Sequence, residues 1–213
     1  MNDRSARKAI RRLGKRLAAR GLVHGTAGNI SVRVANGFLV TPTGAALDRL
    51  DPDELALVSF TGQHVAGKPP SKEASLHRAV YAARPSAHAI LHTHSTHCVA
   101  VTLLRDVPEH DGLPPLTPYY IMRVGYAPVV PYVMPGDPAL AETVGRYMAG
   151  RSVLLLAHHG PVVAGASLDD AAATLEELEE NARLFLLVHG LAYRTLDPAA
   201  VAALRERYPT ENA

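Results

Sequence analysis

The sequence predicts an α/β fold with a mixed or largely antiparallel sheet. Helical and strand-like patterns alternate along the chain, but they do so irregularly, which argues against an all-parallel sheet. The 213 residues suit one domain, and no internal repeat or linker divides them. No G-x-G-x-x-G segment opens a helix after a strand, so a dinucleotide-binding fold has no support. We therefore expect a single domain over residues 1–213.

Composition narrows the functional class. Hydrophobic residues make up 47% of the chain and charged residues 20%, as in soluble globular proteins. The formal net charge of +2 is too small to predict a nucleic-acid-binding protein. No apolar run reaches the roughly 18 residues that a membrane span requires. The single cysteine, Cys98, cannot form an internal disulfide, so we expect a reducing compartment and a cytoplasmic protein.

A first helix is expected over residues 5–20. Ile10, Leu13 and Leu17 recur there at helical spacing, and Gly21 can end the helix. The stretch is basic and poor in acidic residues, which a transit peptide would also show. The apolar spacing favours the helix.

Three strands are expected next, over residues 30–34, 38–40 and 56–60. The dipeptide Asn36-Gly37 separates the first two and is a strong signal for a two-residue hairpin turn. These segments predict an antiparallel unit near the amino terminus.

A second helix is expected from Ser71, a good N-cap residue, to about Arg84, and Pro85 closes it. Residues 89–94 are apolar and predict a buried strand that carries two histidines. Residues 106–138 are rich in proline and tyrosine and look irregular. Long loops of this kind in compact domains are often functional.

The carboxyl-terminal part is expected to hold a helix over residues 138–149, an apolar strand over 153–157 and a long helix over 168–188. Four acidic residues on the long helix are interpreted as a solvated face: Glu176, Glu177, Glu179 and Glu180.

Three histidines are the candidate metal ligands. His92 and His94 are two residues apart in a predicted strand, so their side chains would share a face. Two imidazoles on one face can bind a single divalent ion. His159, in a turn after the second apolar strand, could supply a third ligand, and its neighbour His158 is the competing candidate. Three histidines leave zinc an open position, which is typical of a catalytic site.

Glu73 is the candidate acid or base. It is expected in the first turn of the second helix, where a solvated carboxylate would also be favoured by the helix dipole. A carboxylate beside a cation stays ionised until it takes up a proton.

Three loops have the small residues and main-chain N–H groups that phosphate binding needs. They are Gly28-Asn29, Thr43-Gly44 and Ser71-Lys72, and the last adds an ammonium group. Each loop alone is an ordinary turn, so the prediction depends on whether they converge.

The remaining histidines and Cys98 are interpreted as structural. His97 is a weak candidate for supporting the metal ligands, and Cys98 is expected to be a small buried hydrophobic residue. The others are expected on the surface or in packing: His24, His64, His77, His88, His110 and His189.

Taken together, five motifs resemble the class II aldolase/adducin family. They are Gly25-Thr26-Ala27-Gly28-Asn29-Ile30-Ser31, Thr41-Pro42-Thr43-Gly44, Ser71-Lys72-Glu73, His92-Thr93-His94 and His158-His159-Gly160. The resemblance covers nearly the whole chain, in order. It implies one domain with a central, mostly antiparallel sheet flanked by helices. It also implies a homotetramer with its sites between subunits.

The resemblance assigns roles to individual positions. His92, His94 and His159 match the family's zinc ligands, and Glu73 matches its catalytic carboxylate, which can also bind zinc. Where the family often has a second serine, this chain has Lys72, so the phosphate contacts can differ in detail. The positions matching phosphate-binding residues are Gly28, Asn29, Thr43, Gly44, Ser71 and Lys72.

A narrower resemblance points to the 3-oxo-tetronate 4-phosphate decarboxylase branch of that family. It rests on residues 68–73, 116–125, 129–132, 135–137 and 176–180. It implies release of carbon dioxide from a phosphorylated four-carbon keto acid through a metal-stabilised enediolate, leaving dihydroxyacetone phosphate.

Other activities remain open on the same scaffold. The main alternative is retro-aldol cleavage of a ketose 1-phosphate, as in fuculose-phosphate aldolase. An epimerase, a dehydratase or a non-catalytic adducin-like interaction module is less favoured. Tyr119, Tyr120 and Arg123 are candidate contacts to the leaving portion, and interface packing is the competing interpretation for the two tyrosines. A small phosphorylated substrate is expected, with neither nucleic acid nor membrane as a partner.

Overall fold

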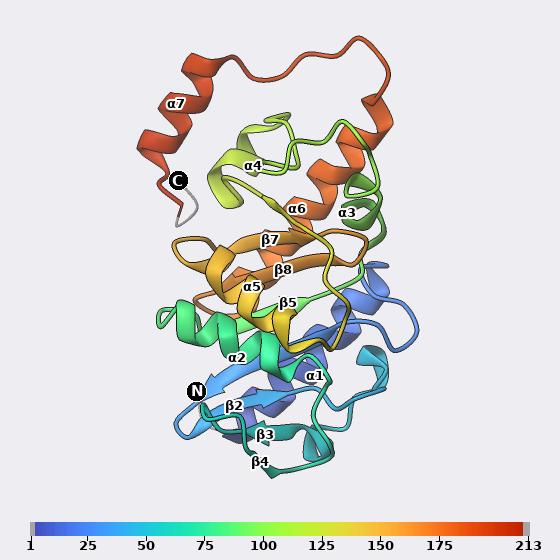
Figure 1. Ribbon diagram of the computed structural model, residues 1–213, viewed down its shortest axis with the longest axis vertical. Coiled ribbons are helices and arrows are strands. Elements are labelled where there is room, and N and C mark those ends of the chain that lie inside the picture. The colour runs from blue at the N-terminus through green and yellow to red at the C-terminus, as the bar shows by residue number, and fades with distance from the viewer. Residues whose placement is uncertain (1–2, 211–213) are drawn as a thin grey trace.

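A mixed eight-stranded sheet runs through the middle of the molecule (Figure 1). The computed structural model describes residues 3–210. Within them the strand order is β4-β3-β2-β1-β5-β8-β7-β6, and every neighbouring pair is antiparallel except β6 and β7. The predicted mixed, mostly antiparallel sheet is therefore confirmed. The strands are β1 (Asn29–Val34), β2 (Gly37–Val40), β3 (Ala56–Val58), β4 (His64–Ala66), β5 (Ala89–His92), β6 (Val129–Val130), β7 (Val153–Leu156) and β8 (Gly160–Gly165).

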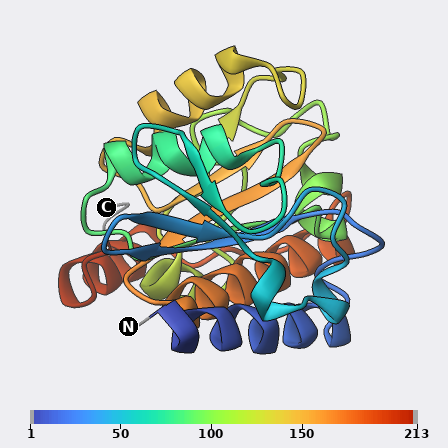
Figure 2. The same ribbon diagram turned by 90° about the horizontal axis from the view of Figure 1, so that it is seen from below.

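Helices cover both faces of this sheet, as Figure 2 shows. On one face α1, α3, α4 and α6 contribute to one core cluster, and on the other face α2 and α5 contribute to a second cluster. The helices are α1 (Asp3–Ala19), α2 (Ala74–Ala83), α3 (Thr96–Val101), α4 (Pro118–Arg123), α5 (Pro138–Met148), α6 (Leu168–Val188) and α7 (Pro198–Arg207). Among residues 3–210, no helix has the length and apolar character needed to cross a bilayer.

The long helices agree closely with the sequence predictions. In α1 the buried side chains include Ile10, Leu13 and Leu17, the residues whose spacing predicted the helix. The bounds of α6 are those expected, and Ser167 caps its amino terminus by accepting a hydrogen bond from the main-chain N–H of Asp170. Strong helical periodicity over three or more turns was therefore a reliable signal.

Shorter elements were missed. The expected irregular stretch, residues 106–138, contains α4 and β6, and the sequence analysis did not predict α3, β8 or α7. Strand β8 begins at Gly160 and is buried throughout. It lies between β5 and β7, so its hydrophobic run has no polar alternation to mark it as a strand.

The β1–β2 turn is one residue away from its predicted position. Val34 pairs with Gly37, so the turn consists of residues 35–36 rather than Asn36-Gly37. Gly37 is already in the strand, where a Cβ would lie 2.1 Å from the carbonyl oxygen of Val58. Glycine is therefore required here for close strand approach and not for the turn.

The start of α2 also differs from the prediction. Ser71 is not the N-cap, because that position is occupied by Glu73. The main-chain N–H of Ser71 donates to the Thr41 carbonyl, and that of Thr43 donates to the Pro69 carbonyl. This pairing holds residues 69–71 extended, so the helix begins only after Glu73.

Strand β5 ends at His92 and not at His94 as predicted. Thr93 and His94 lie beyond it, and α3 begins at Thr96, so His97 is in a helix rather than on a strand. The argument that His92 and His94 project from one face of a strand was therefore wrong in its geometry.

Candidate metal centre and active site

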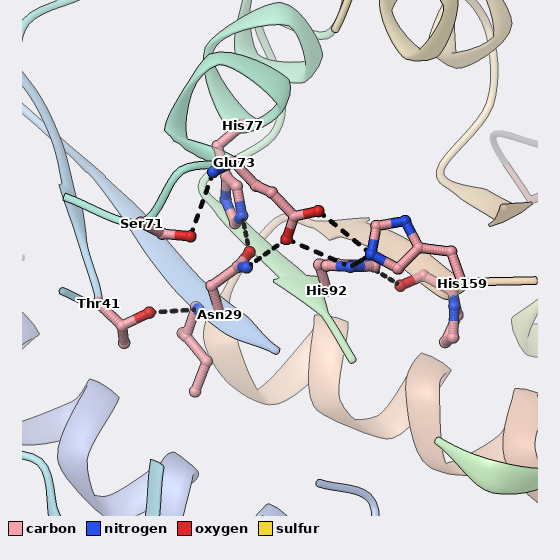
Figure 3. A network of polar contacts seen from close by, with 9 residues as sticks. Asn29, Thr41, Ser71, Glu73, His77, His92 and His159 are labelled. Atoms are coloured by element: carbon pink, nitrogen blue, oxygen red, sulfur yellow. Dashed lines mark hydrogen bonds and ion pairs between the residues drawn. The ribbon is translucent and has the colours of Figure 1, made fainter. Parts of the chain in front are cut away.

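Glu73, His92, His94 and His159 lie close together although they come from three separate regions. Figure 3 shows Glu73, His92 and His159 facing one another. Each offers a ligand atom, and these four atoms all lie within 4.8 Å of one another. Glu73 comes from the start of α2, His92 and His94 from the end of β5, and His159 from the turn between β7 and β8. Sheet pairing explains the meeting, because β8 is hydrogen-bonded to β5.

The ring of His92 is oriented by the main chain. Its Nδ1 lies 2.9 Å from the carbonyl oxygen of Pro161, which can only accept, so Nδ1 carries the proton. The lone pair on Nε2 then faces the cluster, 3.4 Å from Oε2 of Glu73 and 3.2 Å from Nε2 of His159. Metal-binding histidines typically donate their other ring N–H in this way.

Nε2 of His94 is buried and has no hydrogen-bond partner among the described residues. Buried polar atoms in proteins are nearly always paired, so this nitrogen needs a partner that the polypeptide does not supply. A divalent cation would satisfy it. Three imidazoles and one carboxylate whose donor atoms lie within 4.8 Å of one another fit such a cation.

The protonation states also suit a metal. Burial lowers the pKa of His92, and it lowers the pKa of His94 to about 4, so both rings are neutral near pH 7. Burial alone would raise the pKa of Glu73, but hydrogen bonding with His159, the field of His92 and the Asn29 amide outweigh it. The pKa of this carboxyl is held well below its usual range. Neutral imidazoles and an ionised carboxylate are the forms that bind metals.

Gly160 lets two of the ligand-bearing segments approach each other. Its φ angle is 136°, and a Cβ at this position would lie 2.2 Å from the carbonyl oxygen of Thr93. No other residue fits without separating β8 from the chain between His92 and His94. The competition between neighbouring histidines is also resolved, because His159 joins the cluster while His158 projects beside Tyr132, with ring centroids 6.1 Å apart.

The three predicted phosphate loops converge beside the cluster. They line a cavity of about 490 Å³ together with Glu73, His94 and His159. All six predicted positions contribute: Gly28, Asn29, Thr43, Gly44, Ser71 and Lys72. Small residues, hydroxyl groups and one ammonium therefore adjoin the candidate metal centre, an arrangement suited to an anionic group.

Tyr119, Tyr120 and Arg123 are not brought to this cavity within the chain. Tyr120 is completely buried, and its hydroxyl lies 3.2 Å from Oδ1 of Asp111. Tyr119 and Arg123 line a separate cavity of about 770 Å³ along α6.

The structure places two residues differently from the sequence analysis, and one of them, His77, adjoins the site. His77 lies one helical turn after Glu73, is fully buried, and contacts Asn29 (Figure 3). The i, i+4 spacing from Glu73 was an available signal, because such residues share a helix face. Glu179 was expected on a solvated face but is buried, and it accepts hydrogen bonds from the main-chain N–H groups of His97 and Cys98.

Comparison with known proteins gives a consistent result. The family profile described as Class II Aldolase and Adducin N-terminal domain matches residues 8–186. The chain is 47% identical over 206 residues to a 3-oxo-tetronate 4-phosphate decarboxylase from Cupriavidus necator, covering 95% of both chains. It is 35% identical to an L-fuculose phosphate aldolase from Escherichia coli, covering 89% of this chain and 87% of the aldolase.

A solved structure supports the same grouping. The crystal structure of YgbL from Klebsiella pneumoniae superposes with a TM-score of 0.93 at 41% identity. The match covers 96% of this chain and all of the other. The sheet and the helical layers thus belong to a fold seen in a protein of related sequence.

Proposed function

Because this chain belongs to the class II aldolase and adducin family, we propose that it is a metal-dependent carbon–carbon lyase. Its substrate would be a 3-oxo-tetronate 4-phosphate, which it would convert to dihydroxyacetone phosphate and carbon dioxide. The observation that carries this proposal is the cluster of Glu73, His92, His94 and His159 beside a cavity of about 490 Å³. Relatives named as this decarboxylase, up to 47% identical over nearly the whole chain, specify the substrate.

We assign the ligand role to the three histidines and Glu73, with zinc as the metal, because this set of nitrogen and oxygen donors suits zinc. A bound zinc ion would supply Lewis-acid stabilisation for the negative charge that the substrate's ketone oxygen gains during the reaction.

The reaction requires one proton at C2 of the substrate. Cleavage of the bond between the carboxylate carbon and C2 releases carbon dioxide and leaves the bonding electron pair on C2, conjugated with the neighbouring ketone. C2 must then gain one proton to become the hydroxymethyl carbon of dihydroxyacetone phosphate. Glu73 is assigned to this step. Glu73 would bind the metal only before the substrate arrives. Its carboxylate, ionised at rest, would then take up a proton from solvent and deliver it to C2.

The rest of the cavity would hold the substrate in place. The loops at Thr43-Gly44 and Ser71-Lys72 are assigned to the phosphate group, together with Gly28 and Asn29. Holding the phosphate fixes the far end of a four-carbon chain and so positions C2 near Glu73. Tyr119 and Arg123 remain candidates only if a second subunit carries them to a neighbouring cavity.

The proposal also covers the assembly and the compartment. We propose a homotetramer, as in the family, and a cytoplasmic location, since one buried cysteine suits a reducing environment. The proposed single domain over residues 1–213 is supported by the sheet, whose strands come from residues 29–165, and by the family match over residues 8–186.

Retro-aldol cleavage is the second candidate, favoured by the 35% identity to an L-fuculose phosphate aldolase. A paired assay separates the two. Zinc-loaded protein is given a 3-oxo-tetronate 4-phosphate and, separately, a ketose 1-phosphate. We expect carbon dioxide and dihydroxyacetone phosphate in equal amounts from the first substrate and no aldehyde from the second. Aldehyde from the ketose 1-phosphate, with no carbon dioxide from the keto acid, would replace the decarboxylase with the aldolase.

A further inference from the structure

A chain of buried polar side chains leads away from the candidate metal centre under α2. Nδ2 of Asn29 donates to Oε2 of Glu73 at 2.7 Å, and Oδ1 of Asn29 contacts Nε2 of His77 (Figure 3). Nδ1 of His77 lies 2.6 Å from the hydroxyl of Ser31, which lies 2.9 Å from the hydroxyl of Tyr81. Asn29, Ser31, His77 and Tyr81 are each at most 3% exposed.

The direction of each hydrogen bond in this series of side chains follows from the charge state of Glu73. A carboxylate that binds a cation is ionised and only accepts, so the Asn29 atom that faces it must be the amide nitrogen. The amide oxygen then faces His77 and needs a donor, which requires a proton on Nε2. An asparagine turned the other way would place two acceptor oxygens against each other.

The remaining bonds follow from the charge of His77. His77 is fully buried, and its two ring nitrogens contact neutral groups, the Asn29 amide and the Ser31 hydroxyl, so the ring is neutral and carries one proton. With that proton on Nε2, Nδ1 is an acceptor and Ser31 must donate to it. The Ser31 oxygen is then free to accept from the Tyr81 hydroxyl. All donors therefore point toward Glu73.

We propose that His77 is a positioning residue that, as its Nε2–H tautomer, holds the Asn29 amide with its nitrogen toward Glu73. The His77 side chain contacts none of the four candidate donor atoms and does not line the cavity. It therefore acts through Asn29. Residues that support a metal ligand from behind typically contribute 10- to 100-fold in metal affinity or activity. The inference deepens the proposed function and rests on its assignment of Glu73 as a metal ligand.

The tautomer is tested first by NMR, without any turnover. In ¹⁵N-labelled, zinc-loaded protein, the ring signals of His77 are identified as those that disappear in His77→Gln. We expect a proton on Nε2 and none on Nδ1. A proton on Nδ1 instead would leave the Asn29 amide oxygen without its donor and overturn the proposal.

The positioning role is tested by zinc affinity, measured by chelator competition in three variants. His77→Phe keeps an aromatic ring but removes the donor, and we expect zinc binding to weaken about 10- to 100-fold. His77→Gln can donate from its amide to Asn29, and we expect affinity within about threefold of wild type. Tyr81→Phe is the matched control, because Ser31 can still donate to His77 when the far hydroxyl is lost.

Stability is measured on the same variants, since a purely structural role would show there. We expect Tyr81→Phe to lose stability while keeping wild-type zinc affinity, and His77→Phe to lose both. Wild-type zinc affinity in His77→Phe would overturn the proposal, as would equal losses in His77→Phe and His77→Gln. If the tautomer and affinities come out as expected but no carbon dioxide is released, the proposed substrate is wrong and the positioning role stands.

Discussion

Two carboxylates whose side chains are only about a tenth exposed, Glu73 and Glu179, lie near the same stretch of chain yet have different surroundings. Glu179, on α6, accepts hydrogen bonds from the main-chain N–H groups of His97 and Cys98 at 2.9 and 3.0 Å. The ring Nδ1 of His97 adds a third contact at 2.8 Å. Glu73 instead faces two imidazole nitrogens and a cavity.

The two carboxylates are ionised for different reasons. Burial alone would raise the pKa of Glu179, but hydrogen bonds from Cys98 and His97 outweigh it and lower the pKa. The pKa of Glu73 is lowered by histidine nitrogens. Near them, Nε2 of His94 has no hydrogen-bond partner among the described residues. A buried ionised carboxylate is thus not by itself a functional signal. The signal is an incomplete set of partners around it.

Removal of the metal should give the largest difference in behaviour between the Glu73 region and the Glu179 region. Dialysis against a chelator is expected to abolish carbon dioxide release, and zinc, but not magnesium, should restore it, because magnesium prefers oxygen ligands. At zinc concentrations about 100 times the dissociation constant, binding should add about 2.7 kcal/mol to the free energy of unfolding. Full activity in protein shown to be metal-free by elemental analysis would contradict the comparison.

Glu73→Gln should be the most damaging substitution for turnover. The amide cannot transfer the proton, so we expect kcat to fall about 10²- to 10⁴-fold. In zinc-free protein the melting temperature and the circular dichroism spectrum should change little, because the side chain keeps its size. Steady-state release of carbon dioxide measures the effect, and a variant as fast as wild type would remove Glu73 from the mechanism.

Glu179→Gln should show the reverse pattern. An amide nitrogen would face main-chain N–H groups that now donate to oxygen, and we expect the free energy of unfolding to fall by about 1–3 kcal/mol. Turnover per zinc-loaded, folded molecule should stay within a few-fold of wild type. Urea unfolding and kcat, measured together, check this. A large loss of kcat with unchanged stability would mean that the two carboxylates do not differ in role.

Acidification should give the smallest difference in stability, and a single residue, His77, should be its source. Burial lowers the pKa of His77 to about 3, against about 6.5 for an exposed histidine. Below pH 6.5 the unfolded chain takes up a proton that the folded chain does not, so stability falls. In zinc-free protein we expect this residue to account for about 2 kcal/mol of the loss between pH 7 and pH 5.

The comparison comes from two variants measured over the same pH range. His77→Gln should lose correspondingly less stability than wild type on acidification. Glu179 has a different pH dependence. Because its pKa is lowered, it adds stability at pH values above the ordinary carboxyl pKa near 4.3, and this stability is lost only when the pH falls below that value. Glu179→Gln should therefore run parallel to wild type between pH 7 and pH 5. Diverging curves for Glu179→Gln would show that the carboxylate is not ionised throughout this range.

The sequence predicted the histidines of the cluster better than it predicted their support. His92, His94 and Glu73 were identifiable because their motifs are local and resemble a family pattern. Glu179 could not be recognised as buried, since its partners lie 81 and 82 residues away and only the packing of α3 on α6 brings them together.

The fold shows the same division between local and long-range information. Helices α1, α5 and α6 follow from their own periodicity, whereas β8 is specified by the neighbours that bury it on both sides. His77 was assigned to packing because its importance depends on Asn29, which is 48 residues earlier in the chain. Tyr120 illustrates the converse error, since a tyrosine in a suggestive motif is fully buried against Asp111.

Gly160 has a consequence for how this centre could be altered. The distance between His159, in the β7–β8 turn, and the histidines at the end of β5 is set by main chains in contact, with no side chain between them. Repacking the surrounding core would leave that span unchanged, whereas a single added methyl group at position 160 would widen it. We therefore expect the spacing of the candidate ligands to respond more to a substitution at position 160 than to changes in the side chains packed around it.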